Sequence, residues 1–230
     1  MLYKYKIIEP VDMETTDNYY LINGKKYYRV TKVKSVINHE GLNKWRAIVG
    51  DKEAKRVLKE RGELGTKVHN IFEKILNGED INTTKEIEEI QEDVLLFYKF
   101  LGDCNILPSG VEQKLWSKKL MIAGTADYIG NYKTNKKYLK RGREPKFDTD
   151  AFVIGDWKTS SSIYEDYWIQ LATYAHMFEE KTKKKLDGGF IAQFRNGKLK
   201  IEEKTRDELK IYYEIMKHCI PIFKFTIGEY

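Results

Sequence analysis

Apolar and polar positions divide the first half of the chain into a strand-like part and a helix-like part. Residues 19–37 hold an Asn-Gly pair between runs rich in tyrosine, valine and isoleucine, which is a strong signal for a β-hairpin. Residues 42–76 carry apolar side chains at helical spacing, and this pattern is interrupted near Gly62 and Gly65. We therefore expect two helices in series, the second starting at about residue 65, and a third helix over residues 84–101 with Thr84 as its cap.

The second half of the chain alternates strand-like and helix-like segments. The pattern predicts adjacent strands at residues 111–117 and 120–130, a buried strand at 151–159, a helix at 163–181, a hairpin at 190–203 around a second Asn-Gly pair, and a closing helix at 205–223. This order indicates a mixed α/β fold. We expect a single domain made of an N-terminal hairpin (1–40), a helical part (41–110), a catalytic core (111–204) and a C-terminal helix (205–230).

Composition limits the classes of function. The chain has 230 residues with 41 Lys plus Arg against 35 Asp plus Glu, so it is mildly basic and compatible with a polyanionic partner. It has no apolar stretch of the roughly 20 residues that span a bilayer, and acids occur early at its start. A cytoplasmic protein is therefore expected. Its two cysteines, Cys104 and Cys219, lack metal-site spacing, so neither zinc nor an iron-sulfur cluster is expected.

Residues 131–150 interrupt the strand pattern with seven basic and three acidic residues. A solvated surface loop is one interpretation of this composition, and a mobile loop that follows DNA is the other. In the second case DNA would be contacted by Lys133, Lys136, Lys137 and Arg141.

The candidate chemistry lies where two predicted strands end. The chain contains seven acid-x-Lys triplets, but only Asp156-Trp157-Lys158 ends a hydrophobic strand, where alternation puts Asp156 and Lys158 on one face. Asp127 ends the preceding strand and supplies a second carboxylate. Two carboxylates suffice to hold Mg²⁺ together with water and a substrate phosphate. The ion would lower the pKa of a bound water, and Lys158 could orient that water or stabilise the charge on the phosphate.

Two helical pairs could complete such a site. His69 and Glu73 are four residues apart on one predicted helix, and Gln170 and Tyr174 are four apart on another, so each pair shares a helix face. His69 could reach a metal or the substrate, or it could be an ordinary packed residue. Gln170 and Tyr174 could bind a phosphate or hold Lys158, or they could fill and border the core.

Four segments in this order resemble the motif set of RecB-type nucleases in the PD-(D/E)xK superfamily: GTKVH at 65–69, GTAD at 124–127, GDWK at 155–158 and QLATY at 170–174. The segments LINGKKYYRVTKV, WRAIVGDKEAKRV and RGELGTKVHNIFE also resemble the phage and mitochondrial genome maintenance exonucleases of that family. The resemblance spans about residues 20–180 and implies a restriction-endonuclease-like core, with residues 131–150 as an insertion.

The resemblance implies roles for individual residues. By this resemblance the metal ligands of the chain would be His69, Asp127, Asp156 and the backbone carbonyl of Trp157. Lys158 would be the catalytic lysine, with Gln170 and Tyr174 near the DNA and the active centre. Glu112 and Glu73 are weaker candidates for the metal cluster, and base stacking by Trp157, Trp168 or Tyr174 is a further expectation.

The resemblance implies a Mg²⁺-dependent DNA exonuclease of replication, recombination or repair that acts on single-stranded or flapped ends. A phage genome is one source that the resemblance to phage enzymes implies. Mn²⁺ should substitute for Mg²⁺. The chain has no P-loop GxxxxGK[ST] motif and no cluster-binding cysteines, so no nucleotide is expected and a helicase, recombinase or single-strand-binding protein would be a separate partner. Three alternatives stay open: a structure-specific endonuclease, a catalytically silent DNA-binding module, and a hydrolase of small phosphate esters.

Overall fold

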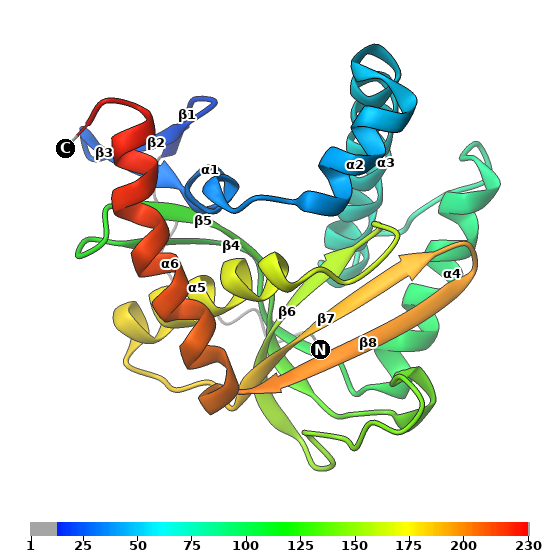
Figure 1. Ribbon diagram of the computed structural model, residues 1–230. Helices are drawn as coiled ribbons and strands as arrows, with labels where there is room; N and C mark the ends of the chain where they lie inside the picture. The colour runs from blue at the N-terminus through cyan, green and yellow to red at the C-terminus, as the bar shows by residue number, and fades with distance from the viewer. Residues whose placement is uncertain (1–12, 230) are drawn as a thin grey trace.

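The computed structural model describes residues 13–229. The expectation about acids at the start of the chain concerns in part residues 1–12, which lie outside the described residues. A mixed sheet of eight strands runs through the centre of the protein (Figure 1). The strands are β1 Met13–Thr15, β2 Tyr19–Ile22, β3 Lys25–Arg29, β4 Leu107–Ser117, β5 Ile122–Tyr132, β6 Ala151–Lys158, β7 Gly188–Arg195 and β8 Lys198–Thr205.

Six α-helices flank this sheet in the described part of the chain. They are α1 Val30–Val33, α2 Glu40–Val49, α3 Asp51–Leu76, α4 Glu88–Asp103, α5 Glu165–Thr182 and α6 Arg206–Thr226, with short 3-10 helices η1 Lys34–Val36 and η2 Lys136–Tyr138. Helices α1, α5 and α6 share one apolar cluster with the sheet, and α3 and α4 share another. The mixed α/β fold predicted from the sequence is confirmed, and α2 with the start of α3 projects from the body (Figure 1).

The order of strands follows β1-β2-β3-β5-β6-β7-β8, with β4 paired to β5. The pairs β3/β5 and β6/β7 are parallel, and the others are antiparallel. Both Asn-Gly pairs form the predicted turns. Asn23 and Gly24 have φ of 51° and 71°, and Asn196 and Gly197 have φ of 49° and 63°, as a two-residue hairpin turn between right-twisted strands requires.

The predicted second strand of the N-terminal hairpin is too long. It ends at Arg29, and the following valines lie in α1 rather than in a strand. Val30 and Val33 are fully buried on one side of this helical turn, in the cluster shared with α5 and α6. The packing of these two side chains outweighs the β propensity of valine, which is a weak and context-dependent preference.

The predicted helix boundary near residue 65 is wrong. The break falls at Gly50, which has φ of 84° between α2 and α3, whereas Gly62 and Gly65 lie inside the 26-residue helix α3. Gly65 is needed for close packing, because a Cβ there would lie 3.0 Å from Oγ1 of Thr159. Thr84 is not a helix cap either: it hydrogen bonds to the side chain of Asn82, and α4 starts four residues later.

Residues 131–150 are held against the body by specific contacts. Lys137 pairs with Asp103 at 2.5 Å, Lys146 pairs with Glu208 at 2.6 Å, and Thr134 donates a hydrogen bond to Glu203 at 2.7 Å. The segment also contains η2 and a bridge from Leu139 to Ile201 of β8. It is therefore a packed surface insertion at the end of the β5/β6 pair.

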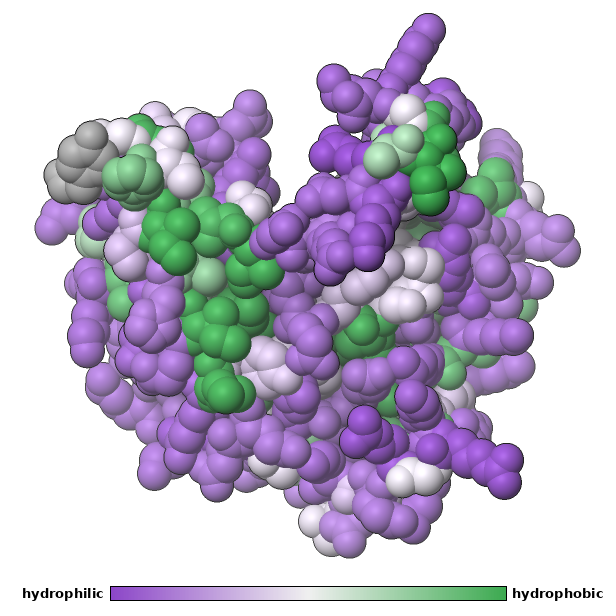
Figure 2. Space-filling model, in the orientation of Figure 1, coloured by the Kyte–Doolittle hydropathy of each residue, from purple (hydrophilic) through white to green (hydrophobic). Residues whose placement is uncertain are grey.

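The visible surface is mostly hydrophilic, with a hydrophobic patch over α6 (Figure 2). Ile211, Ile215 and Ile222 of this helix are 63%, 37% and 52% exposed. None of the helices between residues 13 and 229 is long and apolar enough to pass through a membrane.

Candidate active site

The predicted site residues of β5 lie beside a gap in the sheet. Strand β4 pairs along one edge of β5, so β3 and β6 share the other edge. β3 pairs there with Ile122 and Ala123, and β6 pairs from Tyr128 onward. Within residues 13–229, the GTAD segment at 124–127 therefore pairs with no strand on that edge, and its backbone there lies between the end of β3 and the start of β6.

Three acids lie in one row across β4, β5 and β6. Tyr128 pairs with Gly155, and one further step of the same antiparallel register brings Asp127 opposite Asp156. On the other side, Glu112 falls opposite Asp127, between the pairs formed by Val111 and Gln113. Like charges directly opposite one another destabilise a sheet, so the row is typical of a functional site rather than of a structural one.

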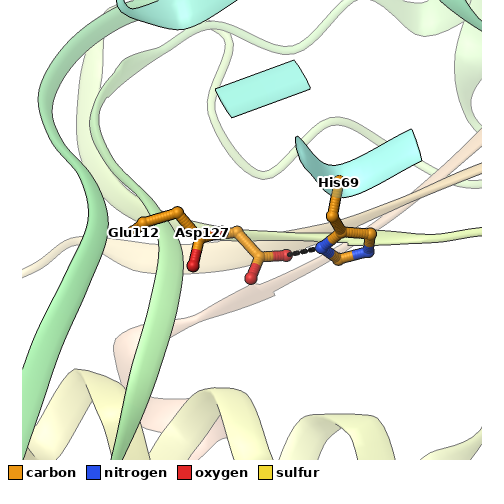
Figure 3. Close-up of side chains that lie close together, drawn as sticks. All are labelled: His69, Glu112 and Asp127. Carbon is orange, nitrogen blue, oxygen red and sulfur yellow. Dashed lines mark ion pairs between the residues drawn. The ribbon is translucent and has the colours of Figure 1, made fainter. Parts of the chain in front are cut away.

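His69 of α3, a helix packed on the sheet, contacts this row of acids at Asp127. Its Nδ1 lies 3.4 Å from Oδ2 of Asp127, and Figure 3 shows the Asp127 carboxylate directed at the imidazole ring with Glu112 beside it. One ligand atom from each of these three residues lies within 4.8 Å of the others. The helix, two strands and the gap thus bring together a cluster that has the size of a metal-binding site.

Asp156 and Lys158 lie next to the cluster on β6. The Lys158 Nζ is 2.5 Å from Oδ2 of Asp156, yet no group among the described residues donates a well-aligned hydrogen bond to this oxygen. Burial and then the neighbouring Asp127 raise the pKa of Asp156, against the effect of Lys158. Burial opposes the charge on Lys158, but the two aspartates raise its pKa, which keeps the ammonium protonated.

The backbone of Trp157 also faces the site. Its N–H donates a 2.9 Å hydrogen bond to Oδ2 of Asp127, in place of a strand partner. In an extended strand the N–H and C=O of one residue point to the same edge, so the Trp157 carbonyl points toward Asp127 as well. This direction is the one expected for a carbonyl ligand at the site.

Glu112 has a strained backbone. Its φ is 45° in the middle of β4, shortly after a register shift between Pro108 and Gly110, and a side chain with this conformation is uncommon outside functional sites. Burial, followed by repulsion from Asp127, Glu73 and Asp156, raises the pKa of Glu112 to about 8. Glu73 therefore acts on this acid electrostatically, but it is not one of the three clustered ligands.

Gln170 and Tyr174 lie on α5 beneath the GTAD segment. Tyr174 is only 4% exposed, and a Cβ at Gly124 would come within 2.5 Å of its hydroxyl oxygen. Burial raises the pKa of Tyr174, and its phenol also interacts with Gln170. Tyr174 therefore packs directly against the backbone of Gly124, and a residue larger than glycine at position 124 would displace the tyrosine.

Several residues that were expected to contact nucleic acid are buried in the core or lie away from the acids of the site. Trp157 and Trp168 are 2% and 1% exposed and, like Tyr174, cannot stack on a base without unpacking the core, so that expectation is wrong for this structure. The four cations Lys133, Lys136, Lys137 and Arg141 lie in or beside the insertion, beyond Tyr132 and before Ala151, at the opposite end of β5 and β6 from the acids.

Two further features of the site are only weakly indicated by the sequence. Glu112 was only a weaker candidate, although its place opposite Asp127 follows once the register of the predicted hairpin is known. Tyr167 of α5 is near Gln170 and Tyr174 in the sequence, but no motif assigns it a role, and the centroid of its ring lies 4.9 Å from the Lys158 Nζ. The tyrosine is three residues before Gln170, a spacing that puts both on nearby faces of one helix.

The donor set fits a hard divalent cation. Carboxylate oxygens from Glu112 and Asp127, with the His69 imidazole, lie close enough to share one ion, and Asp156, which pairs with Lys158 and is not one of these three ligands, lies on the neighbouring strand. Carboxylate, carbonyl and water ligands suit Mg²⁺ and Mn²⁺. The repulsion among the acids would be relieved by such a charge.

No protein-family model matches the chain, and no curated protein matches it. Among solved structures, the chain is similar to the crystal structure of SSO0001 with a TM-score of 0.33 and 12% sequence identity, over 91% of this chain and 78% of that chain. A likeness of this size carries no information about activity.

Proposed function

We propose that this protein is a divalent-metal-dependent deoxyribonuclease of the PD-(D/E)xK class that hydrolyses phosphodiester bonds from DNA ends. The observation that supports it most is the convergence of His69, Glu112 and Asp127 beside the buried pair of Asp156 and Lys158. These residues come from α3, β4, β5 and β6, and all of them except Glu112 belong to the nuclease motifs that the sequence resembles, in the same order along the chain.

The site residues have distinct roles in this proposal. His69, Glu112, Asp127, Asp156 and the Trp157 carbonyl would hold Mg²⁺ or Mn²⁺. A bound ion would activate a water molecule and neutralise charge on the phosphate. Lys158 carries a proton and stabilises negative charge that develops on the phosphate oxygens. Gln170 and Tyr174 keep the GTAD backbone in place.

The substrate class is supported by charge and by the resemblance. The net charge of +6 favours a polyanion over a small ester. The nucleases whose motifs the sequence resembles act on DNA ends or flaps. We therefore propose DNA, with single-stranded ends preferred, as the substrate in replication, recombination or repair in a cytoplasm. A helicase, recombinase or single-strand-binding protein would supply strand separation.

The test is a cleavage assay with end-labelled linear and circular DNA, single- and double-stranded, in Mg²⁺, Mn²⁺ or EDTA. We expect linear DNA to shorten from its ends only with metal, and Asp156→Ala and Lys158→Ala to bind DNA without cutting it. A matched control exists on β8, where Lys200 and Glu202 form a 2.6 Å ion pair two residues apart on one strand face. Lys200→Ala and Glu202→Ala should cleave normally.

The other outcomes separate the alternatives. Equal cleavage of circles and linear strands would replace the exonuclease by an endonuclease. Binding without metal-dependent cleavage by the unmodified protein would reject catalysis and leave a DNA-binding module. Cleavage of small phosphate esters with no salt-dependent binding of DNA would reject a polymeric substrate, because binding to a polyanion weakens steeply with salt.

A further inference from the structure

A tyrosine that none of the nuclease motifs contains lies against the lysine of the site. Tyr167 is in the first turn of α5, and the Lys158 Nζ lies 4.9 Å from the centroid of its ring. A second cation, the Nζ of Lys34 in η1, lies 5.1 Å from the same centroid. An ammonium group at such a distance is attracted by the negative face of an aromatic ring.

The ring itself is confined by its neighbours. The Tyr164 ring packs edge-to-face against it at 5.5 Å, and the phenol interacts with Ser160. Burial raises the pKa of Tyr167, so its phenol stays neutral near pH 7. The ring therefore offers Lys158 a neutral surface in a fixed place.

A buried ion pair anchors the residue next to this tyrosine. Asp166 accepts a hydrogen bond from Lys34, and the two side chains are only 8% and 12% exposed. His39 Nε2 lies 3.9 Å from the same carboxylate oxygen. Because Asp166 and Tyr167 are consecutive, the contact with η1 fixes the start of α5 and, with it, the position of the ring.

The need for such support follows from the length of lysine. Its four-carbon side chain is flexible and carries a point charge that can move between partners. In the protein described here, Lys158 rests on Asp156. If that carboxylate bound a cation, it would share its charge between the ion and the ammonium, and the Tyr167 ring would be a second contact that holds the ammonium.

We propose that Tyr167 is a positioning residue for Lys158: its ring keeps the ammonium directed at the place where the site would hold a phosphate, and Lys34 with Asp166 keeps the ring in place. This inference rests on the proposed function for the role of Lys158. In this proposal Tyr167 changes the rate of the chemical step through its contact with Lys158 and does not touch the substrate.

The test compares Tyr167→Phe, which keeps the ring, with Tyr167→Leu, which removes it. We expect Tyr167→Leu to lower kcat by about tenfold with KM changed less than about twofold, and Tyr167→Phe to keep most of the activity, because the attraction depends on the ring face. Tyr213→Leu is the matched control. Tyr213 also has a lysine over its ring, Lys217 at 5.4 Å, but lies on α6 against His176.

A second measurement does not depend on cleavage. In protein labelled with ¹³C at the lysine ε-carbon, the Lys158 signal, assigned by its loss in Lys158→Arg, should show a ring-current shift in the unmodified protein and in Tyr167→Phe, with and without Mg²⁺. The shift should disappear in Tyr167→Leu and persist in Tyr213→Leu.

These readouts separate the two proposals. If the unmodified protein does not cleave DNA but the ring-current shift is present with Mg²⁺, the nuclease function fails and the positioning of Lys158 stands. If the protein cleaves DNA and Tyr167→Leu matches its kcat, or if Tyr167→Phe and Tyr167→Leu lose activity equally, the positioning role is rejected. Loss of the shift on adding Mg²⁺ would also reject it.

Discussion

The acidic side chains at the two ends of the β5/β6 pair are arranged in opposite ways. At the end with the insertion, two acids are paired with donors: Asp103 has Lys137, and Glu203 accepts hydrogen bonds from Tyr132 and Thr134. At the other end, Glu112, Asp127 and Asp156 face one another across three strands. At the insertion end these acids lie apart, each with donors of its own, whereas at the site end three acids lie together with one lysine, Lys158, so that a bound cation would relieve their mutual repulsion.

The pKa values express the same difference. Hydrogen bonds from Lys137 and Tyr138 lower the pKa of Asp103, an acid at the insertion end. Burial, with repulsion from Asp127, raises the pKa of Glu112 to about 8 at the site end. An arrangement of acids that costs folding free energy persists where the surrounding structure enforces it, and this is typical of sites that act on a ligand or substrate.

The largest effect is expected from the lysine at the site end. Lys158→Ala removes the positive charge beside Asp156 and the one available to a phosphate, so kcat for DNA cleavage should fall by a factor on the order of 10²–10³. Steady-state cleavage of linear DNA measures this change. Lys146→Ala, which breaks an ion pair with Glu208 at the insertion end, should leave kcat within about twofold, and a similar loss in both variants would remove the contrast between the ends.

The next effect is a dependence of stability on pH at the site end. In the unfolded chain a glutamate has a pKa of about 4.3, whereas folding raises that of Glu112 to about 8. Between these values the folded state binds the extra proton, so stability falls as pH rises through this window, by about 5 kcal/mol at most, and is constant above it. Urea unfolding in EDTA at intervals from pH 5 to pH 9 measures this slope.

Glu112→Gln should make that slope shallower, and only the difference from the unmodified protein is informative, because burial also raises the pKa of Asp93, to about 7. Asp103→Asn at the insertion end should leave the slope in this window unchanged. Mg²⁺ should stabilise the unmodified protein more at pH 8 than at pH 6, since it binds the ionised acids. An identical slope in Glu112→Gln would show that this acid does not titrate as described.

A smaller effect is expected where Tyr174 supports the site end. The Cβ of Gly124→Ala would overlap the buried tyrosine, whose hydroxyl oxygen lies 2.5 Å from that position, and overpacking of this kind costs about 1–3 kcal/mol. Thermal or urea unfolding measures the loss. Gly62→Ala in α3 is the control, because a Cβ there meets nothing within 4 Å and the helix should gain up to about 1 kcal/mol. Equal stability of Gly124→Ala and the unmodified protein would mean that the tyrosine moves freely.

The smallest effect is expected at the insertion end. Replacing Lys133, Lys136, Lys137 and Arg141 together by glutamine should change stability by about 0.5 kcal/mol or less and kcat by less than about twofold, because exposed ion pairs contribute little. The dependence of DNA binding on salt should keep its slope. A slope that becomes shallower by about 0.7–0.9 for each lost cation would instead extend the DNA path to this end, as the composition of the insertion first indicated.

The parts of the fold that follow from short-range rules were predictable. Asn23-Gly24 and Asn196-Gly197 fix two hairpins by their turn chemistry, and the apolar strand before Asp156 identified one acid-x-Lys triplet among seven. Alternation along that strand predicted that Asp156 and Lys158 share a face, and their 2.5 Å contact agrees with it. The local pattern was sufficient here because strand geometry alone places these side chains.

The parts that depend on distant packing were not predictable. Gly65 interrupts a helical pattern, yet it lies inside α3, where a Cβ would come within 3.0 Å of the distant residue Thr159. The positive φ of Glu112 depends on how β4 bends against β5. The burial of Trp168, at 1% exposure, depends on α6, which lies 38 residues or more further along the chain. Each of these features depends on a contact between residues that are far apart in the chain, so a local sequence pattern does not reveal it.

The gap beside residues 124–127 has a consequence for variation in length. β5 and β6 are fully paired from Tyr128 to Tyr132 and separate only beyond Gly155, so the paired segment stands between the insertion and the acids. Residues can be added to or removed from the connection without altering the register that sets Asp127 opposite Asp156. The insertion is therefore a position at which related proteins could differ in size, and to which a tag or a second binding module could be joined, while the geometry of the acids is preserved.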